Sequence, residues 1–425
     1  MTLALVIVPL LLLALGFPIF IVLLAGSVAA LTGYMQMPMT AIQQNMFGSL
    51  NTPGLLAVPY FIFAGELMSR GSVSKRLVDM VGSVVGALPG ALGVTTVGTA
   101  TVFGAISGSS AASVVAVGKV MTPEMMRDGY PPVFAAGMIT SVSAIGIIIP
   151  PSIPMIIYGA AAEASIPRLY AGGVIPGLIL AAALALYIML RARIGGFGTS
   201  TRPQLNRIVR ATGRATWALG APAIVLGGIY GGIFSPTEAA AIASAYALIV
   251  TKLIYRELSW AEILDSARIS VVFTAQVLII ISVAGLFSWI LTVNQVPQTV
   301  VAWIAAQDIS AWQFLLVVNV LLLLVGCFID PLSAILLLTP ILIPIVDSMG
   351  IDRVHFGIVM TLNLAIGLFT PPFGINIFVA QAVLGMRAPD IYRGVVPFFL
   401  VFLVVLMLIT FVPSISLWSV DLFMF

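Results

Sequence analysis

An eight-residue motif occurs twice in this chain, and each copy interrupts an apolar run. Residues 144–151 read AIGIIIPP and residues 365–372 read AIGLFTPP, an offset of 221 residues (365 − 144 = 221) with five identical positions. Proline removes a backbone donor and clashes with the preceding helical turn, so an apolar helix must break at each copy. A broken apolar helix in each half of a chain is typical of transporter binding sites.

The rest of the sequence indicates that these runs lie in a membrane. Hydrophobic residues make up 61% of the 425 residues, charged residues 8%, and the mean hydropathy is +1.18. A soluble domain carries about 25% charged residues, so the composition indicates an all-α polytopic membrane protein. At about 20 residues per span, the length allows on the order of 11–14 spans or half-spans. The apolar run from Leu3 to Leu31 is predicted to be a first membrane segment and not a signal peptide.

The rare chemical groups exclude several kinds of site. The single cysteine, Cys327, excludes an internal disulfide bond. The single histidine, His355, argues against a zinc site and against a proton relay built from histidines. We expect His355 to lie outside the bilayer, in a loop that leads into a helix.

Arginines crowd the middle of the chain, where the two halves meet. Six of them fall within one short segment, and no Asp or Glu occurs between Ala164 and Thr237: Arg191, Arg193, Arg202, Arg207, Arg210 and Arg214. The positive-inside rule makes this connection cytoplasmic. Because residues 195–200, GGFGTS, also have a linker composition, we predict a basic linker over residues 191–214. The cluster is either a topology signal in contact with lipid or a docking site for a partner subunit.

Two further segments are poor candidates for simple spanning helices. Residues 107–113, SGSSAAS, would leave polar groups at membrane depth, which favours a re-entrant hairpin over 98–121 whose tip lines a watery cavity. The counterpart, GCFIDPLS at 326–333, is broken by proline, and we predict a second hairpin over 315–346. Each hairpin is followed by a broken helix, predicted over 132–162 and 355–385.

Unwound helices in a bilayer provide ligands for ions. Their free carbonyls suit a hard cation such as sodium, and the amides at a helix start suit a carboxylate. We predict one cation site in each half: Gly104, Ser107, Gly146, Ile149 and Pro151 in the first, and Gly326, Asp330, Gly367, Thr370 and Phe373 in the second. We predict substrate contacts from Ser109, Ser110, Ser152 and Asn376. The alternative is that the glycines and prolines only kink packed helices.

Acidic residues beside apolar runs have more than one interpretation. Asp330 is a functional candidate because an ionisable group within a membrane segment is costly. It could lie near a cation, accept hairpin amides or sit at a wet hairpin tip. For Glu66 and Glu238 we predict structural roles, as caps of helix starts or at an interface.

At this level the chain resembles the large membrane subunit of tripartite ATP-independent periplasmic (TRAP) transporters, the DctM or SiaM type. The resemblance covers nearly the whole length. Its motifs are PYFIFAGELM at 59–68, GAISGSSAA at 104–112, IPPSI at 149–153, FSPTEAA at 234–240, VHFG at 354–357 and TPPFG at 370–374. Related subunits are sometimes fused to a small four-helix subunit of the DctQ or SiaQ type. Since this chain starts directly at the large part, we expect the small subunit to be a separate chain.

The resemblance implies a fold and a mechanism. The fold would consist of two inverted repeats, with residues 1–89 and 215–311 as scaffold and residues 90–190 and 312–425 as an elevator-type transport domain. Two sodium ions, and no nucleotide, would drive uptake of an organic acid of the sialic acid or C4-dicarboxylate type. A periplasmic binding protein would deliver that acid to a permease in the bacterial inner membrane. The partners would be these subunits, the acid and lipid, with no nucleic acid and no enzymatic activity.

Three other classes compete with this interpretation. A sodium/carboxylate symporter of the same superfamily would need no binding protein. An intramembrane serine protease could use the GAISG stretch at 104–108, but His355 would be its only possible histidine base. A channel would need a continuous pore, whereas two closed hairpin sites favour alternating access. The sequence does not name the substrate. No Arg lies between Leu77 and Val117 or between Thr140 and Pro167, so the first-half site lacks a guanidinium group to bind a carboxylate.

Overall fold

The computed structural model describes residues 3–198 and 204–423, and these residues form helices and no strand. The helices of the first half are α1 (Val8–Ala14), α2 (Ile19–Ala30), α3 (Met39–Leu50), α4 (Ala57–Arg70), α5 (Val73–Val85), α6 (Ala91–Ser107), α7 (Ser110–Arg127), α8 (Pro132–Val142), α9 (Ile153–Ala161) and α10 (Ile166–Gly195). Those of the second half are α11 (Leu205–Tyr230), α12 (Pro236–Ile249), α13 (Trp260–Val293), α14 (Val296–Ala306), α15 (Ala311–Gly326), α16 (Pro331–Ser348), α17 (Arg353–Gly367), α18 (Ile375–Leu384), α19 (Ala388–Phe411) and α20 (Ser414–Phe423). Short π- or 3₁₀-helical turns are η1 (Leu3–Ile7), η2 (Leu31–Met35), η3 (Pro53–Leu56), η4 (Ser143–Ile147) and η5 (Val250–Ile254).

Each half contains the predicted hairpin followed by a broken helix. The first hairpin is α6 and α7 with its tip at Gly108 and Ser109, and the second is α15 and α16 with its tip at 327–330. The first broken helix is α8 with η4, then α9, and the second is α17 followed by α18. Both helix breaks at the proline pairs are therefore confirmed.

Local chemistry explains where these helices stop and restart. Gly108 ends α6 with a φ of +58°, a backbone conformation that favours glycine. Ser109 then caps α7 by accepting the N–H of Ala112. Ser152 caps α9 by accepting the N–H of Met155, directly after a cis peptide bond between Pro150 and Pro151. The second copy of the motif also has a cis bond, between Pro371 and Pro372.

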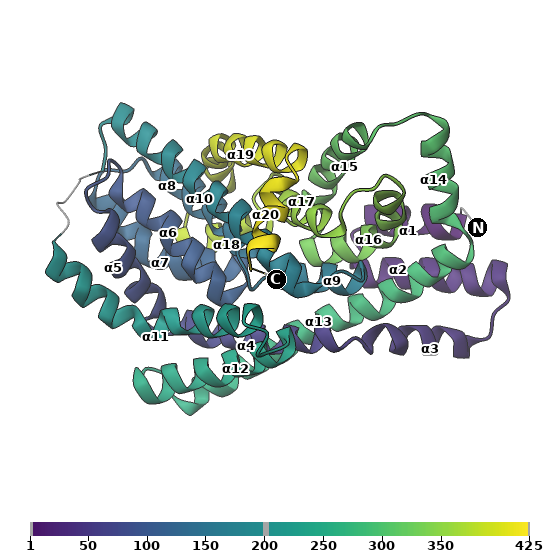
Figure 1. Ribbon diagram of the computed structural model, residues 1–425, viewed down its shortest axis with the longest axis horizontal. Helices are drawn as coiled ribbons and strands as arrows, with labels where there is room; N and C mark the ends of the chain where they lie inside the picture. The colour runs from purple at the N-terminus through teal and green to yellow at the C-terminus, as the bar shows by residue number, and fades with distance from the viewer. Residues whose placement is uncertain (1–2, 199–203, 424–425) are drawn as a thin grey trace.

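The hairpins and broken helices of the two halves pack together. Helix α7 contacts α18, α8 contacts α19, and α17 contacts α10. Figure 1 shows α3, α4, α11, α12 and α13 along the lower edge, with the hairpins and broken helices above them. Helix α13 bridges these parts, since it packs on α3 and α4 and also on α16.

Several helices have the length and composition of membrane spans. Five of them qualify, and a sixth span is possible if α3 and α4, which meet at a bend of 65°, count as one. The five are 166–195, 236–254, 260–293, 331–348 and 388–411. Most remaining apolar helices are too short to span by themselves, because hairpins and breaks divide them. The run from Leu3 to Leu31 is also divided, since α1 ends at Ala14 and α2 starts after Pro18, so the prediction of one segment was wrong in detail.

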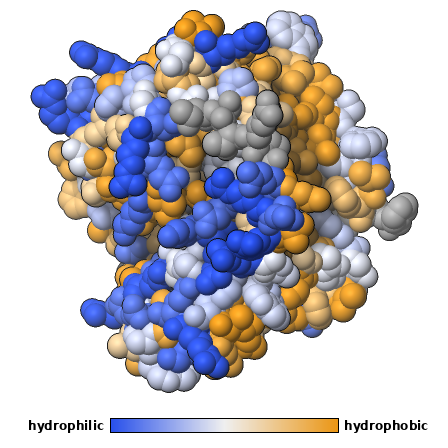
Figure 2. Space-filling view, turned by 90° about the vertical axis from the view of Figure 1, so that its left-hand side faces the viewer, coloured by the Kyte–Doolittle hydropathy of each residue, from blue (hydrophilic) through white to orange (hydrophobic). Residues whose placement is uncertain are grey.

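The charged end of the molecule coincides with the predicted basic linker. Figure 2 shows hydrophilic residues gathered on the face where α5, the end of α10 and the start of α11 lie. The exposed arginines of this segment are Arg191, Arg193, Arg207, Arg210 and Arg214. Arg202 and the middle of the predicted linker, residues 199–203, lie outside the described residues.

Candidate functional site

A central cavity of about 530 Å³ lies where both hairpin tips meet α4 and α13. Its walls are mostly aliphatic, with a small number of polar groups. The polar side chains that line it are Glu66, Ser107, Ser109, Ser110, Gln276, Asp330 and Asn376. This composition is typical of a small-molecule site, in which apolar walls surround a few orienting polar groups.

Four helices begin at this cavity. The first residues of α7, α9, α16 and α18 all line it: Ser110, Ile153, Pro331 and Ile375. A helix start carries a partial positive charge and backbone N–H groups without helical partners. Prolines remove one such N–H from α9 and one from α16, and in α18 Asn376 donates its N–H to the Leu368 carbonyl. The halves of the chain thus aim four helix N-termini at one space, which favours an anionic ligand.

One of these four termini is already neutralised. The Asp330 carboxylate accepts the N–H groups of Leu332 and Ser333, each at 3.1 Å, and the hydroxyl of Ser333 donates to it. Helices α7 and α9 are capped by uncharged serines. Their positive ends, and that of α18, are therefore the ones available to an anion.

Asn376 connects the two halves at the cavity. Its Nδ2 donates to the Ser110 hydroxyl at 2.7 Å and to the Thr140 carbonyl at 3.0 Å. Its Oδ1 is buried and has no hydrogen-bond partner among the described residues. Of the predicted substrate residues, Ser109, Ser110 and Asn376 line the cavity. Ser152 does not, because its hydroxyl points into the helix break, where it donates to the Ile147 carbonyl.

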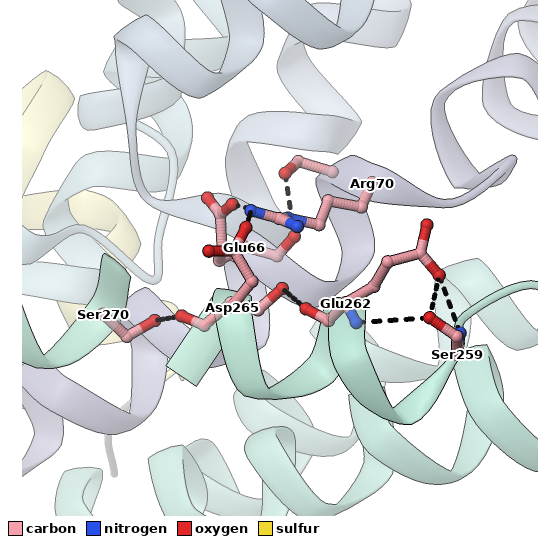
Figure 3. A network of polar contacts seen from close by, with 8 residues as sticks. Glu66, Arg70, Ser259, Glu262, Asp265 and Ser270 are labelled. Atoms are coloured by element: carbon pink, nitrogen blue, oxygen red, sulfur yellow. Dashed lines mark hydrogen bonds and ion pairs between the residues drawn. The ribbon is translucent and has the colours of Figure 1, made fainter. Parts of the chain in front are cut away.

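Helices α4 and α13 form a wall that the sequence analysis missed. Glu66 lies within α4 and lines the cavity, so of its two predicted roles the place at an interface fits and the cap of a helix start does not. Its carboxylate accepts Arg70 Nε at 2.9 Å, and Arg70 also donates to Asp265 of α13 at 2.7 Å (Figure 3). Arg70 and Asp265 are 195 residues apart in the chain, so no local pattern could have indicated this contact.

The first predicted cation set surrounds a close contact between hairpin and broken helix. A Cβ atom added to Gly104 would lie 2.4 Å from the Cα of Gly146, so the two backbones touch. A Cβ added to Gly108 at the hairpin tip would lie 2.9 Å from the Pro151 carbonyl oxygen. Ser107 and Ile149 are also buried at this junction. The junction holds carbonyl groups away from water, the kind of ligand that a hard monovalent cation prefers.

The second predicted cation set also surrounds a contact between two glycines, and one of its residues is exposed. A Cβ added to Gly367 would lie 2.5 Å from the Gly326 carbonyl oxygen. Thr370 donates its hydroxyl to the Ile366 carbonyl at 2.6 Å. Phe373 is 53% exposed and packs on Phe328 of the hairpin, with ring centroids 5.8 Å apart.

These junctions are built from backbone and small side chains and lack the ligands of a transition-metal site among the described residues. Among the described residues, no group of three or more His, Cys, Asp or Glu side chains could hold a metal ion. His355, which we expected outside the bilayer, is 1% exposed in the first turn of α17, where its Nε2 lies 3.3 Å from the Thr410 carbonyl. It belongs to neither junction and does not line the cavity.

Two hairpins and two broken helices around one cavity define a membrane transporter fold. The crystal structure of the YdaH transporter of Alcanivorax borkumensis is similar, with a TM-score of 0.63 and 15% identity over 88% of both chains. MtrF of Neisseria gonorrhoeae is similar with a TM-score of 0.56 and 12% identity, over 91% of this chain and 84% of that one.

Residues 6–415 match the family model of the tripartite ATP-independent periplasmic transporter, DctM component, so the chain belongs to this family. It is 41% identical over 85% of its length to the C4-dicarboxylate large permease protein DctM of Pseudomonas aeruginosa, covering 85% of that protein. It is 39% identical to the ectoine/5-hydroxyectoine large permease UehC of Ruegeria pomeroyi, over 97% of this chain and 96% of that one. It is 40% identical over 96% of its length to the isethionate permease protein DctMQ of Oleidesulfovibrio alaskensis, of which it spans 64%.

Proposed function

We propose that this large permease subunit uses a sodium gradient to take up a small organic acid across the bacterial inner membrane. A periplasmic binding protein delivers the acid, and a small four-helix membrane subunit completes the permease. The relatives' names give the range of substrates, since they include C4-dicarboxylate, ectoine and isethionate transporters. The fused name DctMQ of one relative supports the small subunit as a partner.

The observation that carries this proposal is the convergence of four helix N-termini on one cavity. The anionic group of the acid binds to the N–H groups of the first residues of α7, α9 and α18, which are Ser110, Ile153 and Ile375. The next residues of α9 and α18 add none, because Pro154 has no N–H and Asn376 donates its N–H to the Leu368 carbonyl. The aliphatic walls exclude water, which strengthens these interactions. Asn376 fixes the two halves relative to each other through Ser110 and orients the bound acid with its free Oδ1.

Sodium is a co-transported substrate in this proposal, and it supplies positive charge beside the bound acid. The backbone carbonyls around Gly104 and Gly146 hold one ion, and those around Gly326 and Gly367 hold the second. Because each junction joins a hairpin to a broken helix, an ion bound there stabilises the hairpin tip that contacts the acid. Ion binding and acid binding are thereby coupled.

Movement between the two membrane faces follows an elevator scheme in this proposal. Residues 90–190 and 312–425 carry the cavity past residues 1–89 and 215–311. Glu66 and Gln276 belong to the stationary side and line the cavity in the described conformation. Both hairpin tips travel with the bound acid.

Transport into proteoliposomes tests the proposal. Liposomes would hold this chain with its small subunit, and the acid would be the one found in the purified partner binding protein. We expect accumulation only when the loaded binding protein is outside and sodium is directed inward. Unchanged uptake with choline in place of sodium and only a proton gradient would overturn the coupling. Unchanged uptake of free acid without the binding protein would instead identify a symporter that needs no binding protein.

A further inference from the structure

The charges around the central cavity are unusual for a site that binds acids. Two carboxylates line it, Glu66 and Asp330, and no Lys, Arg or His is found among the described lining residues. Asp330 is engaged by the amides of its own helix. Glu66 is a second carboxylate, placed on the wall formed by α4 and α13 (Figure 3).

Glu66 also masks the cation beside the cavity. Arg70 lies one helical turn beyond Glu66, does not line the cavity, and bonds to Glu66 Oε1 at 2.9 Å and to Asp265 Oδ2 at 2.7 Å. Its guanidinium is therefore held between two carboxylates, and Glu66 is the partner that faces the cavity. Such pairing keeps the Arg70 guanidinium from binding a second anionic group of a ligand.

The uncharged polar groups require a particular kind of ligand. The Asn376 Oδ1 is buried without a partner among the described residues, and an acceptor left unpaired in this way costs free energy. A hydroxyl, amide or ammonium group on the ligand would satisfy it. A ligand fits these polar groups if it has one anionic group at the helix N-termini and a hydrogen-bond donor at the Asn376 Oδ1.

We propose that the cavity selects substrates with a single anionic group and an uncharged or cationic remainder, and that Glu66 rejects a second anionic group. This inference rests on the proposed function, since it takes the cavity as the substrate site. A second carboxylate on the substrate would face Glu66 across a space with mostly aliphatic walls, where like charges repel more strongly than in bulk water. Changing Glu66→Gln removes this charge from the cavity wall and leaves Arg70 with Asp265 as its remaining charged partner.

Binding of three four-carbon probes to the full-length chain in lipid nanodiscs tests the inference. The probes are 4-hydroxybutyrate, 4-aminobutyrate and succinate, which differ mainly in the group at one end. Affinities would come from ligand-induced thermal stabilisation in sodium buffer. We expect succinate to bind at least about tenfold more weakly than the other two to the wild type. In Glu66→Gln we expect the difference to vanish or reverse.

Glu262→Gln is the matched control. It removes the same charge from the same side of the protein, but Glu262 caps the start of α13 and does not line the cavity. The control should keep the wild-type order of affinities. The Glu66→Gln amide can still accept the Arg70 hydrogen bond, so we expect this variant to fold.

Equal or tighter binding of succinate to the wild type would overturn the inference. So would an unchanged order in Glu66→Gln, or a lack of stabilisation by all three probes. These outcomes can be separated from a failure of the proposed function, because the binding test needs no sodium gradient and no partner protein. Sodium-driven uptake together with tight succinate binding would leave the proposed function intact and remove only this selectivity.

Discussion

At the residue scale, Asp330 serves the hairpin tip as the N-cap of α16. Its two carboxylate oxygens accept two backbone N–H groups and the Ser333 hydroxyl. Of the roles considered from the sequence, acceptance of hairpin amides is confirmed. A role of Asp330 beside the second cation site stays a prediction.

Two substitutions separate these roles. Asp330→Asn keeps a good N-cap but removes the charge, so we expect little change in stability and a rise of about tenfold in half-saturating sodium, about 1.4 kcal/mol. Asp330→Ala also removes the cap and should cost about 1 kcal/mol of stability. Sodium titrations of the melting temperature measure both effects. Identical half-saturation in Asp330→Asn and wild type would limit Asp330 to capping.

Gly367 gives a second test at this scale. A Cβ at this position would lie 2.5 Å from the Gly326 carbonyl oxygen, and backbone cannot move aside cheaply. We expect Gly367→Ala to abolish sodium-dependent stabilisation and uptake, with an overpacking cost of about 1–3 kcal/mol. Gly213→Ala is the control, since nothing lies within 4 Å of a Cβ there. Normal sodium dependence in Gly367→Ala would mean that the glycine pair is only a packing contact.

The roles of single residues could be predicted from the sequence where their contacts come from nearby residues in the chain. Glu238 was predicted as a possible cap, and it forms a capping box with Ser235 three residues away. For Glu66 the sequence could not choose between a cap and an interface, because the residue that holds Arg70 beside it, Asp265, comes from α13, nearly half the chain away. His355 was placed correctly at a helix start, but its burial depends on α19, which supplies the Thr410 carbonyl.

At the element scale, the helix breaks were predictable because their causes are local. Proline pairs, Gly108 and the capping serines lie in the sequence where the helices stop. The outer ends of the first hairpin were predicted less well. It runs from Ala91 to Arg127, where the sequence indicated 98–121. Helices α3 and α14 were missed, since each is short and is held by contacts with other helices, α3 with α13 and α14 mainly with α16.

A clamp between two loops makes stability depend on pH. Glu257, between η5 and α13, accepts the backbone N–H of Ser72 at 2.7 Å, the Ser72 hydroxyl and Arg76 at 3.1 Å. Burial raises the pKa of Glu257, but hydrogen bonds from Ser72 and the charge of Arg76 outweigh it, so the net pKa lies below its ordinary 4.5. A depressed carboxyl pKa stabilises the fold above the ordinary value, and this stabilisation is lost as pH falls through the folded-state pKa.

Thermal melts of Glu257→Gln and wild type across pH test this clamp. We expect the wild type to be more stable at pH 7 by on the order of 1 kcal/mol. The difference should shrink as the pH falls below about 4.5. Glu163→Gln, which removes an exposed carboxylate elsewhere, is the comparison variant. A constant difference between Glu257→Gln and wild type would show that the charge of Glu257 does not matter.

At the scale of the whole molecule, the two halves have corresponding parts in different environments. Ala64-Gly65 on α4 corresponds to Ala284-Gly285 on α13 (285 − 65 = 220). A Cβ on Gly65 would lie 3.0 Å from Ser107, so the first hairpin tip is seated on α4. A Cβ on Gly285 would instead meet Ser49 of α3, and a second cavity of about 430 Å³ lies beside it. The second hairpin tip is therefore not seated at the corresponding place.

This asymmetry predicts a contact that forms only in the opposite transport state. If the halves exchange environments, the second hairpin tip, which carries Cys327, moves against α13 near Gly285. Because Cys327 is the only cysteine, one substitution suffices to detect it. In Ser288→Cys, whose position lines the second cavity, we expect a disulfide with Cys327 when an added thiol oxidant is present during turnover. Uptake should then be blocked, and an added thiol reductant should restore it. Thr292→Cys, about 6 Å further along the same helix, should not cross-link. Active uptake without any cross-link in Ser288→Cys, or equal cross-linking in both variants, would rule out this exchange of environments.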